Sequence, residues 1–435
     1  MPFVVEFEAF HWENTVSTTT TPAITDAALE QSARAYRCQC GGPVFFRNST
    51  CLACGTPLGY HPENARLFPL KPVNNGAAWA LWDDDGQTYQ SCANANTPAT
   101  CNWLLPSSDA HQHIGLCRAC RLNRTIPDLT DPNHPDNGEL WGRVELAKRR
   151  MVSALLVMGL PVASRETEDT ERGVMFDFLR SPAEGPHVMT GHNQGLITLN
   201  INEADDAVRE AARRAMHEPY RTLVGHFRHE IGHYYWDRLV WDTPWLEKFR
   251  TLFGDENQDY AASLKKNYEE GPNPDWPQHF VSAYASVHPW EDWAECWAHY
   301  MHMRDTVDTA QSYGLTIDSA QIEFTPFTAD WLYQSDHPDA ERFLGFLNHW
   351  TLLTMMLNGM SRAMGQPDFY PFVLPHEAVT KLHFIHLLVL SARETPCLAA
   401  LAPLPPLEFA APAGGSQSQS QSITLNTEPL NPLTP

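Results

Sequence analysis

Apolar residues recur at helical spacing through most of the chain beyond residue 138. Between Glu139 and Leu160 they return every three or four positions, and the segment closes at Gly159-Leu160-Pro161, which predicts an amphipathic helix. Residues 195–201 alternate apolar and polar side chains with β-branched character and predict a strand. Further helices are predicted over residues 203–216, 220–241, 343–363 and 376–390. This pattern favours an α+β fold that is mostly helical and contains one small sheet.

The two ends of the chain lack this periodicity. Residues 1–30 contain the run Ser17-Thr18-Thr19-Thr20-Thr21, which indicates a poorly ordered or strand-like extension, and residues 131–138 form a linker rich in turn-forming residues. Beyond Pro396 the chain is rich in proline and alanine, and it then alternates serine and glutamine over residues 416–422. A segment of that composition cannot bury enough apolar surface to order itself.

Eight of the ten cysteines fall within the first 120 residues and form two sets of four. The first set has the spacing C-x-C-x10-C-x2-C, and the second has C-x8-C-x15-C-x2-C. Such paired spacings favour metal over disulfides in an intracellular chain, because each tight turn brings two thiolates to one zinc ion. The second set has a wide first arm, so His111 and His113 are candidate substitute ligands. The expected ligands of two structural zinc ions are Cys38, Cys40, Cys51 and Cys54 in the first set, and Cys92, Cys101, Cys117 and Cys120 in the second.

These features divide the chain into five regions. The extension, residues 1–30, precedes a zinc ribbon at 31–66 and a second cysteine-zinc module at 67–135. Residues 136–400 form the main helical domain, and residues 401–435 form a disordered tail rich in proline, serine and glutamine.

The charge balance argues against a general binder of nucleic acids or anionic membranes. The chain has 30 Lys+Arg against 52 Asp+Glu, a formal net charge of −22, and Arg118, Arg121 and Arg124 form only a small basic cluster. The longest apolar run, residues 151–162, is too short for a bilayer, which needs about twenty residues. The N-terminus has no basic region typical of a secretory signal, so we expect a soluble cytoplasmic protein.

Residues 229–233 read His-Glu-Ile-Gly-His, an HExxH pattern inside a predicted helix. On a helix, His229 and His233 lie one turn apart on the same face and can share a Zn²⁺ ion. Glu230 lies beside that metal and can accept the proton of zinc-bound water. The strand predicted over 195–201 precedes this helix, where zinc peptidases place an edge strand that pairs with extended substrate.

A zinc site on this helix needs a third protein ligand, and a downstream segment offers two candidates. Glu291 and Glu295 are four residues apart in the sequence HPWEDWAECWAHY, so they share one face of a predicted helix. Carboxylates are costly to bury in so apolar a stretch unless a metal ion and a histidine N–H neutralise them.

The order of these motifs resembles the bacterial zinc-binding metallopeptidases that carry an N-terminal zinc ribbon. The resemblance spans residues 36–390 and rests on LCRACRLNRTIPDL, GHFRHEIGHYYWDRL and HPWEDWAECWAHYMH. The two helical motifs also resemble the gluzincins, in particular lethal-factor-like peptidases, which carry HExGH followed by ExxAE with a preceding tyrosine. A zincin-like fold and a peptidase activity are what this resemblance implies.

The gluzincin resemblance also implies roles for individual residues. His229, His233 and Glu291 would bind the catalytic zinc, and Glu295 would orient a ligand histidine or replace Glu291 as a ligand. Tyr284 stands seven residues before Glu291, the separation at which that group keeps its transition-state tyrosine, although the residues between them differ. His288 competes with Tyr284 as the group that stabilises the oxyanion, while Glu230 acts as the general base.

Other polar residues near these motifs have simpler interpretations. Asp237 is either a partner of a metal ligand or a member of a surface salt bridge with Arg238 or Arg228. Ordinary core or surface positions are expected for His226, His299, His302, Cys296 and Cys397.

We therefore expect a zinc-dependent metallopeptidase with one catalytic and two structural zinc ions, acting on a peptide or protein. An alternative is a non-catalytic adaptor whose zinc modules recruit a protein partner, and a third hypothesis is a nucleic-acid-associated ribbon protein. The presence of Glu230 favours the peptidase, because an inactive descendant has no chemical need for that carboxylate.

Overall fold

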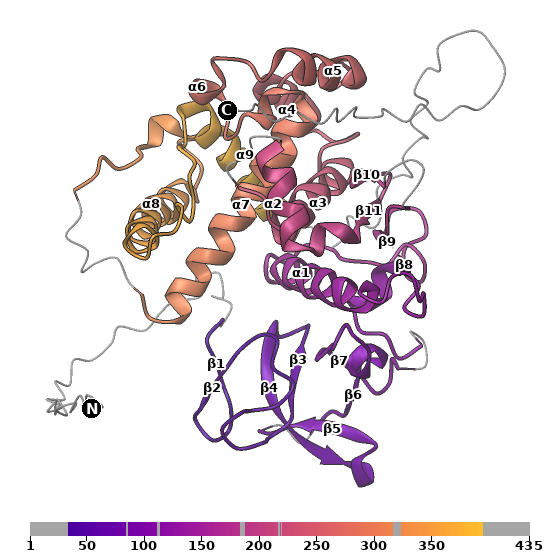
Figure 1. Ribbon diagram of the computed structural model, residues 1–435. Coiled ribbons are helices and arrows are strands. Elements are labelled where there is room, and N and C mark those ends of the chain that lie inside the picture. Colours follow the sequence, from indigo (N-terminus) through magenta and orange to yellow (C-terminus); the bar gives the residue numbers. More distant parts are fainter. Residues whose placement is uncertain are drawn as a thin grey trace, which may run out of the picture. The chain divides into compact units, whose positions relative to one another are not determined.

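The structure is a computed structural model that describes residues 34–83, 86–110, 114–182, 188–215, 218, 220–315 and 323–394 (Figure 1). The extension and the tail expected from the sequence lie outside these residues, as do His111, His113 and Cys397. The fold is of the α+β class, with short strands before residue 126 and mostly helices after it. No described helix is both long and apolar enough to cross a lipid bilayer.

Short antiparallel strands form the N-terminal part of the described chain. β1 (Tyr36–Arg37) pairs with β2 (Pro43–Val44), and five further strands form a sheet in the order β3-β4-β5-β6-β7. Those strands are β3 (Leu58–His61), β4 (Arg66–Val73), β5 (Ala78–Leu81), β6 (Tyr89–Ser91) and β7 (Leu104–Pro106). His61 of β3 pairs with Arg66 of β4, so the boundary that we expected between residues 66 and 67 falls inside the β3–β4 hairpin.

The first long helix, α1 (Asn137–Val157), confirms the helix predicted from Glu139. It ends where Gly159 adopts a φ of 69°, and the N–H of Leu160 then bonds the carbonyl of Leu155 at 3.0 Å. Glycine reaches this left-handed conformation without strain, so it stops the helix before the expected end at Leu160.

A second, mixed sheet has the strand order β10-β11-β9-β8. Its members are β8 (Asn123–Thr125), β9 (Met175–Leu179), β10 (Gly191–Asn193) and β11 (Leu196–Asn200). β11 confirms the strand predicted over 195–201, but it lies between β9 and β10, so the prediction that it forms the sheet edge was wrong. The reason is a two-residue turn: Gln194 and Gly195 both have positive φ, and such a turn folds β10 back along β11.

The helix predicted over 203–216 is divided in two. A short 3-10 helix, η4 (Ile201–Ala204), precedes α2 (Asp206–Ala215). The Asp205 carboxylate accepts hydrogen bonds from the backbone N–H groups of Ala207 and Val208 at 2.7 and 3.1 Å, so it caps α2 and starts a new helix there.

Two antiparallel helices, α3 (Leu223–Leu239) and α7 (Pro289–Ser312), form the centre of the helical region. Trp236 near the end of α3 packs on Trp290 at the start of α7, with ring centroids 5.5 Å apart, while Arg228 reaches Asp305. The backbones approach closely at Gly232, where a Cβ would lie 3.2 Å from both the Ala294 Cα and the Trp297 Cβ. A larger residue at the glycine of the HExxH segment would therefore crowd α7.

The remaining helices surround this pair. Three short helices connect α3 to α7 along the chain, namely α4 (Leu246–Phe253), α5 (Tyr260–Glu270) and α6 (Trp276–His279). α8 (Ala340–Ala363) and α9 (His376–Glu394) follow α7 and confirm the helices predicted over 343–363 and 376–390. The other 3-10 segments are η1 (Asn74–Gly76), η2 (Ala93–Asn96), η3 (Cys120–Leu122), η5 (Tyr284–Ser286) and η6 (Ala329–Trp331).

A buried ion pair fastens α9 to α7. Lys381 Nζ lies 2.6 Å from Asp292 Oδ2, and the two side chains are 5% and 0% exposed. Burial raises the pKa of Asp292 to about 6, although the Lys381 ammonium lowers it in part. Because Asp292 is shielded from water, its negative charge is compensated by Lys381 and not by solvent.

Replacing Lys381 with methionine leaves the Asp292 charge buried without its partner. We expect Lys381→Met to lower the free energy of unfolding by about 3–5 kcal/mol, which is typical of a broken buried pair. The measurement is the urea midpoint at neutral pH, followed by circular dichroism. The matched control is Lys265→Met, because Lys265 pairs with Glu269 on the surface of α5 with 73% of its side chain exposed. That variant should change stability by less than about 1 kcal/mol, and equal midpoints for the two variants would contradict the prediction.

Candidate metal centres

The four sulfurs of the first cysteine set converge on one point. Cys38 Sγ lies 3.6 Å from Cys54 Sγ, and Cys40 Sγ lies 3.8 Å from Cys51 Sγ. Four sulfurs at the corners of a tetrahedron, each about 2.3 Å from zinc, would be about 3.8 Å apart. All four cysteines are free thiols, so the structure agrees with the metal interpretation rather than with disulfides.

The second cysteine set forms an equivalent cluster that is fully buried. Cys101 Sγ lies 3.7 Å from Cys117 Sγ, and the Cys117 N–H donates to Cys92 Sγ at 3.4 Å. One sulfur from each of the four cysteines fits within a group in which all ligand atoms lie within 4.8 Å of one another. The described residues thus offer one zinc ion four ligands, namely Cys92, Cys101, Cys117 and Cys120, while the candidate substitutes His111 and His113 lie outside them.

A third group of metal-binding side chains forms where α3 faces α7. His229 Nε2 lies 2.9 Å from Glu291 Oε2 and 3.2 Å from His233 Nε2, and His233 Nε2 lies 3.7 Å from the same Glu291 oxygen. Ligand atoms about 2.0–2.1 Å from a tetrahedral zinc would be about 3.3 Å apart. The HExxH spacing places both histidines on one face of α3, and the first turn of α7 supplies the carboxylate.

The Glu291 carboxylate fits a bound cation. Its side chain is 1% exposed, and its Oε2 atom accepts no hydrogen bond from the described residues but faces the two imidazole nitrogens. Burial lowers the pKa of His229, but the carboxylates of Glu291 and Glu295 raise it more strongly, to well above the usual value. Two carboxylates thus lie against the His229 ring, and a zinc ion would compensate their negative charge while binding His229, His233 and Glu291.

Glu295 is engaged differently from Glu291. Its Oε1 accepts a hydrogen bond from His229 Nδ1 at 2.8 Å, and its Oε2 accepts one from the Ser282 hydroxyl at 2.6 Å. The bond to Nδ1 fixes the imidazole ring and leaves Nε2 of His229 directed at Glu291 and His233. This geometry favours Glu291 as the ligand and Glu295 as the group that orients a ligand histidine.

Glu230 occupies a position suited to a base. It follows His229 on α3, is 8% exposed, and has no hydrogen-bonding or ion-pair partner among the described residues. A carboxylate that is this deeply placed and unpaired remains available to a water molecule or a substrate in the same space.

Tyr284 and His288, the two candidate electrophiles, differ in their surroundings. Tyr284, in η5, places its ring centroid 5.9 Å from that of His229. His288 instead caps α7: its Nδ1 accepts from the Trp290 N–H at 3.1 Å, and its Nε2 contacts the Gln258 carbonyl at 3.2 Å. Both ring nitrogens of His288 thus have backbone partners, which favours Tyr284 as the candidate electrophile.

Two contributors to this centre were missed in the sequence. Tyr260, the first residue of α5, donates its hydroxyl to Glu291 Oε1 at 2.6 Å, and Ser282 supports Glu295 as described above. Neither residue belongs to the HExxH or the ExxAE segment, and a tyrosine 31 positions before its partner gives no periodic signal.

The remaining polar residues near the motifs have other partners. Arg228 binds Asp305 at 2.6 Å and Arg238 binds the Arg172 carbonyl at 2.7 Å, so neither pairs with Asp237 as one of our alternatives proposed. Asp237 lies 3.8 Å from His192 Nε2 of β10 instead. Cys296, as expected, is buried. The histidines for which we expected ordinary core or surface positions each contact another side chain: His226 contacts Glu203, His299 contacts Tyr370 and His302 contacts Arg228.

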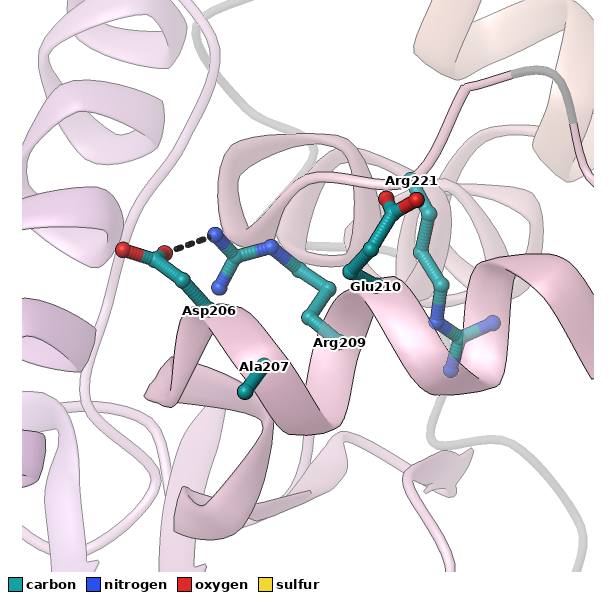
Figure 2. A pocket seen from close by; sticks show the side chains of 5 residues that line it. All are labelled: Asp206, Ala207, Arg209, Glu210 and Arg221. Carbon is teal, nitrogen blue, oxygen red and sulfur yellow. Dashed lines mark hydrogen bonds and ion pairs between the residues drawn. The ribbon is translucent and has the colours of Figure 1, made fainter.

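A separate cavity of about 530 Å³ lies on α2, and Figure 2 shows its lining side chains. They are Asp206, Ala207, Arg209, Glu210 and Arg221. Arg209 pairs with Asp206, and Arg221 binds Glu218 at 2.8 Å, so the guanidinium groups are already neutralised. None of the metal-binding candidates lines this cavity.

Comparisons with known proteins agree with these groups of ligands. Residues 137–388 match a family described as "Putative zinc-binding metallo-peptidase", and residues 35–131 match a zinc-ribbon domain. The chain is 41% identical over 358 residues to proteins of Mycobacterium tuberculosis and Mycobacterium bovis that are described as uncharacterized. These alignments cover 82% of this chain and 95% of each relative. No solved structure matches the chain.

The family match covers most of the helical region, and it includes both helices that carry the third group of ligands. The zinc-ribbon match contains both cysteine sets. These matches confirm the resemblance to the zinc-ribbon family drawn from the motifs, and the chain belongs to the family described as "Putative zinc-binding metallo-peptidase", with a zinc-ribbon domain at its N-terminal side.

Proposed function

We propose that the chain is a zinc-dependent metallopeptidase that hydrolyses peptide bonds. One observation carries the proposal: two imidazole nitrogens of α3 and one carboxylate oxygen of α7 meet within 3.7 Å, beside an unpaired glutamate. A purely structural zinc site is closed by four protein ligands, whereas a catalytic one has three and keeps a position for water. The proposed ligands are three, namely His229, His233 and Glu291.

The bound zinc would lower the pKa of its water and polarise the scissile carbonyl. Glu230 would accept the proton of that water and later deliver it to the leaving amine. This transfer needs an ionisable group that is not held by another partner. Glu295 holds His229 through Nδ1 and so keeps Nε2 free for the metal.

Tyr284 is the proposed donor to the developing oxyanion. Burial, and then the negative charge of Glu291, raises the pKa of its hydroxyl well above the usual value, so the group stays protonated. A neutral hydroxyl beside the metal ligands can donate a hydrogen bond to a carbonyl oxygen as it gains negative charge.

The edge strand β10 is the proposed place for an extended substrate. It is the outer strand of its sheet in the described structure, and its His192 ring stacks on the His233 ring with centroids 6.2 Å apart. A peptide that paired with β10 would therefore pass beside the metal ligands.

The rival hypothesis of nucleic-acid binding gains no support from the basic cluster. Arg121 pairs with Glu168 at 2.6 Å, and Arg124 pairs with Asp177. Both guanidinium groups are thus neutralised within the protein, and phosphate binding would require breaking these pairs.

The role of Glu230 is tested by Glu230→Gln, which removes the base but keeps the shape of the side chain. We expect cleavage of a protein or peptide-library substrate to fall by at least about a hundredfold, with the zinc content unchanged. The control is Glu247→Gln on α4, where the carboxylate is 81% exposed and pairs with Arg250 at the surface. Unchanged turnover in Glu230→Gln, with zinc still bound, would refute the proposed role of this residue.

Elemental analysis of the purified chain tests the number of metal sites. We expect three zinc ions per chain in the wild type and two in His233→Ala, because one ligand of the third site is lost while both cysteine sets remain. Cys120→Ser should remove a different ion, from the second cysteine set. Two ions in both the wild type and His233→Ala would instead support the non-catalytic adaptor.

A further inference from the structure

The ligand Glu291 uses its two carboxylate oxygens for different contacts. Oε2 faces His229 and His233, whereas Oε1 accepts the hydroxyl hydrogen of Tyr260 at 2.6 Å. The terminal torsion of a glutamate is soft, so an unsupported carboxylate can rotate and present either oxygen, or both, to a metal. A short hydrogen bond to one oxygen selects the other for the metal.

The position of the Tyr260 hydroxyl is itself fixed by α7. Its ring packs edge-on against His288, the residue that caps α7, with ring centroids 5.2 Å apart, and it lies 6.1 Å from the Trp290 ring. The same turn that carries Glu291 therefore holds the tyrosine that bonds to it. Asp259, the residue before Tyr260, caps the start of α5. Its carboxylate accepts the Ala262 N–H at 3.0 Å, which sets the first residue of that helix at Tyr260.

The helix α5 lies largely at the surface. No side chain of α5 is fully buried, and Tyr268, two turns after Tyr260, has 60% of its surface exposed. The hydroxyl–carboxylate bond is thus a specific contact between a surface helix and the metal-binding group, not one of many contacts in a packed core.

We propose that Tyr260 is a positioning residue that holds Glu291 in a one-oxygen orientation as the third zinc ligand. The inference rests on the proposed function, because it takes His229, His233 and Glu291 as the zinc site. Tyr260 serves Glu291 as Glu295 serves His229: each supports a ligand through an atom that does not face the metal.

The test is the zinc affinity of the third site in Tyr260→Phe, which loses the hydroxyl and keeps the ring that packs on His288. Affinity is measured on the full chain by titrating free zinc against a chromogenic chelator, after zinc has been removed from the weakest site only. Loss of such a supporting bond typically weakens metal binding 10- to 100-fold, so we expect a rise in Kd of at least about tenfold.

Two tyrosine variants separate this role from others. Tyr268→Phe makes the same chemical change on the same helix at an exposed position, and it should leave the zinc affinity unchanged. Tyr284→Phe should also keep the affinity while lowering the rate of peptide cleavage, because its proposed role is in the reaction rather than in metal binding. Circular dichroism of all three variants should show the wild-type fold at the temperature of the zinc titration, so that a lost affinity is not a loss of folding.

Equal zinc affinity in Tyr260→Phe and the wild type would overturn the inference, as would an equal loss in Tyr268→Phe. Failure of the proposed function gives a different result, because a chain that lacks the third site contains two zinc ions before and after His233→Ala. A selective loss in Tyr260→Phe supports the inference even before a peptide substrate is known.

Discussion

Two adjacent carboxylates, Glu291 and Asp292, are buried in the first turn of α7, and the arrangement around that turn depends on compensating them. They are 1% and 0% exposed. An uncompensated charge at such a depth would cost several kcal/mol. Asp292 receives Lys381 from α9, whereas Glu291 faces two histidines of α3 and a tyrosine of α5. Each of the helices α3, α5 and α9 therefore contacts α7 through at least one group that compensates a buried carboxylate.

The second cysteine set is built against the helical region rather than attached to it by a free linker. Arg149 of α1 donates to the Ala99 carbonyl at 2.8 Å, inside the loop between the first two cysteines of that set. Glu145, one turn earlier and fully buried, accepts from Asn123 at 2.7 Å and lies beside Cys120. A metal ion in this set would order the surface on which α1 packs, so the zinc ribbon and the helical region share part of one core.

Features with a fixed local spacing were predictable from the sequence. His229 and His233 meet because residues four apart share a helix face, and the close pairs Cys51–Cys54 and Cys117–Cys120 meet because two intervening residues make a tight turn. The long helices were found because their apolar stripes recur over several turns. Their ends were less certain, since capping by Asp205 and the left-handed Gly159 depend on single residues.

The sequence by itself therefore determined which chemical groups the protein has and which of them are neighbours along a helix or a turn. Only the tertiary structure decided that Glu295 is bound to His229 and Ser282, which leaves Glu291 to face the histidines. It likewise decided that Tyr260 reaches Glu291, that His288 caps a helix, and that β10 rather than β11 lies at the sheet edge. The physical reason is that these contacts join segments far apart in the chain. Their distances are set by how helices and strands pack, which no local period encodes.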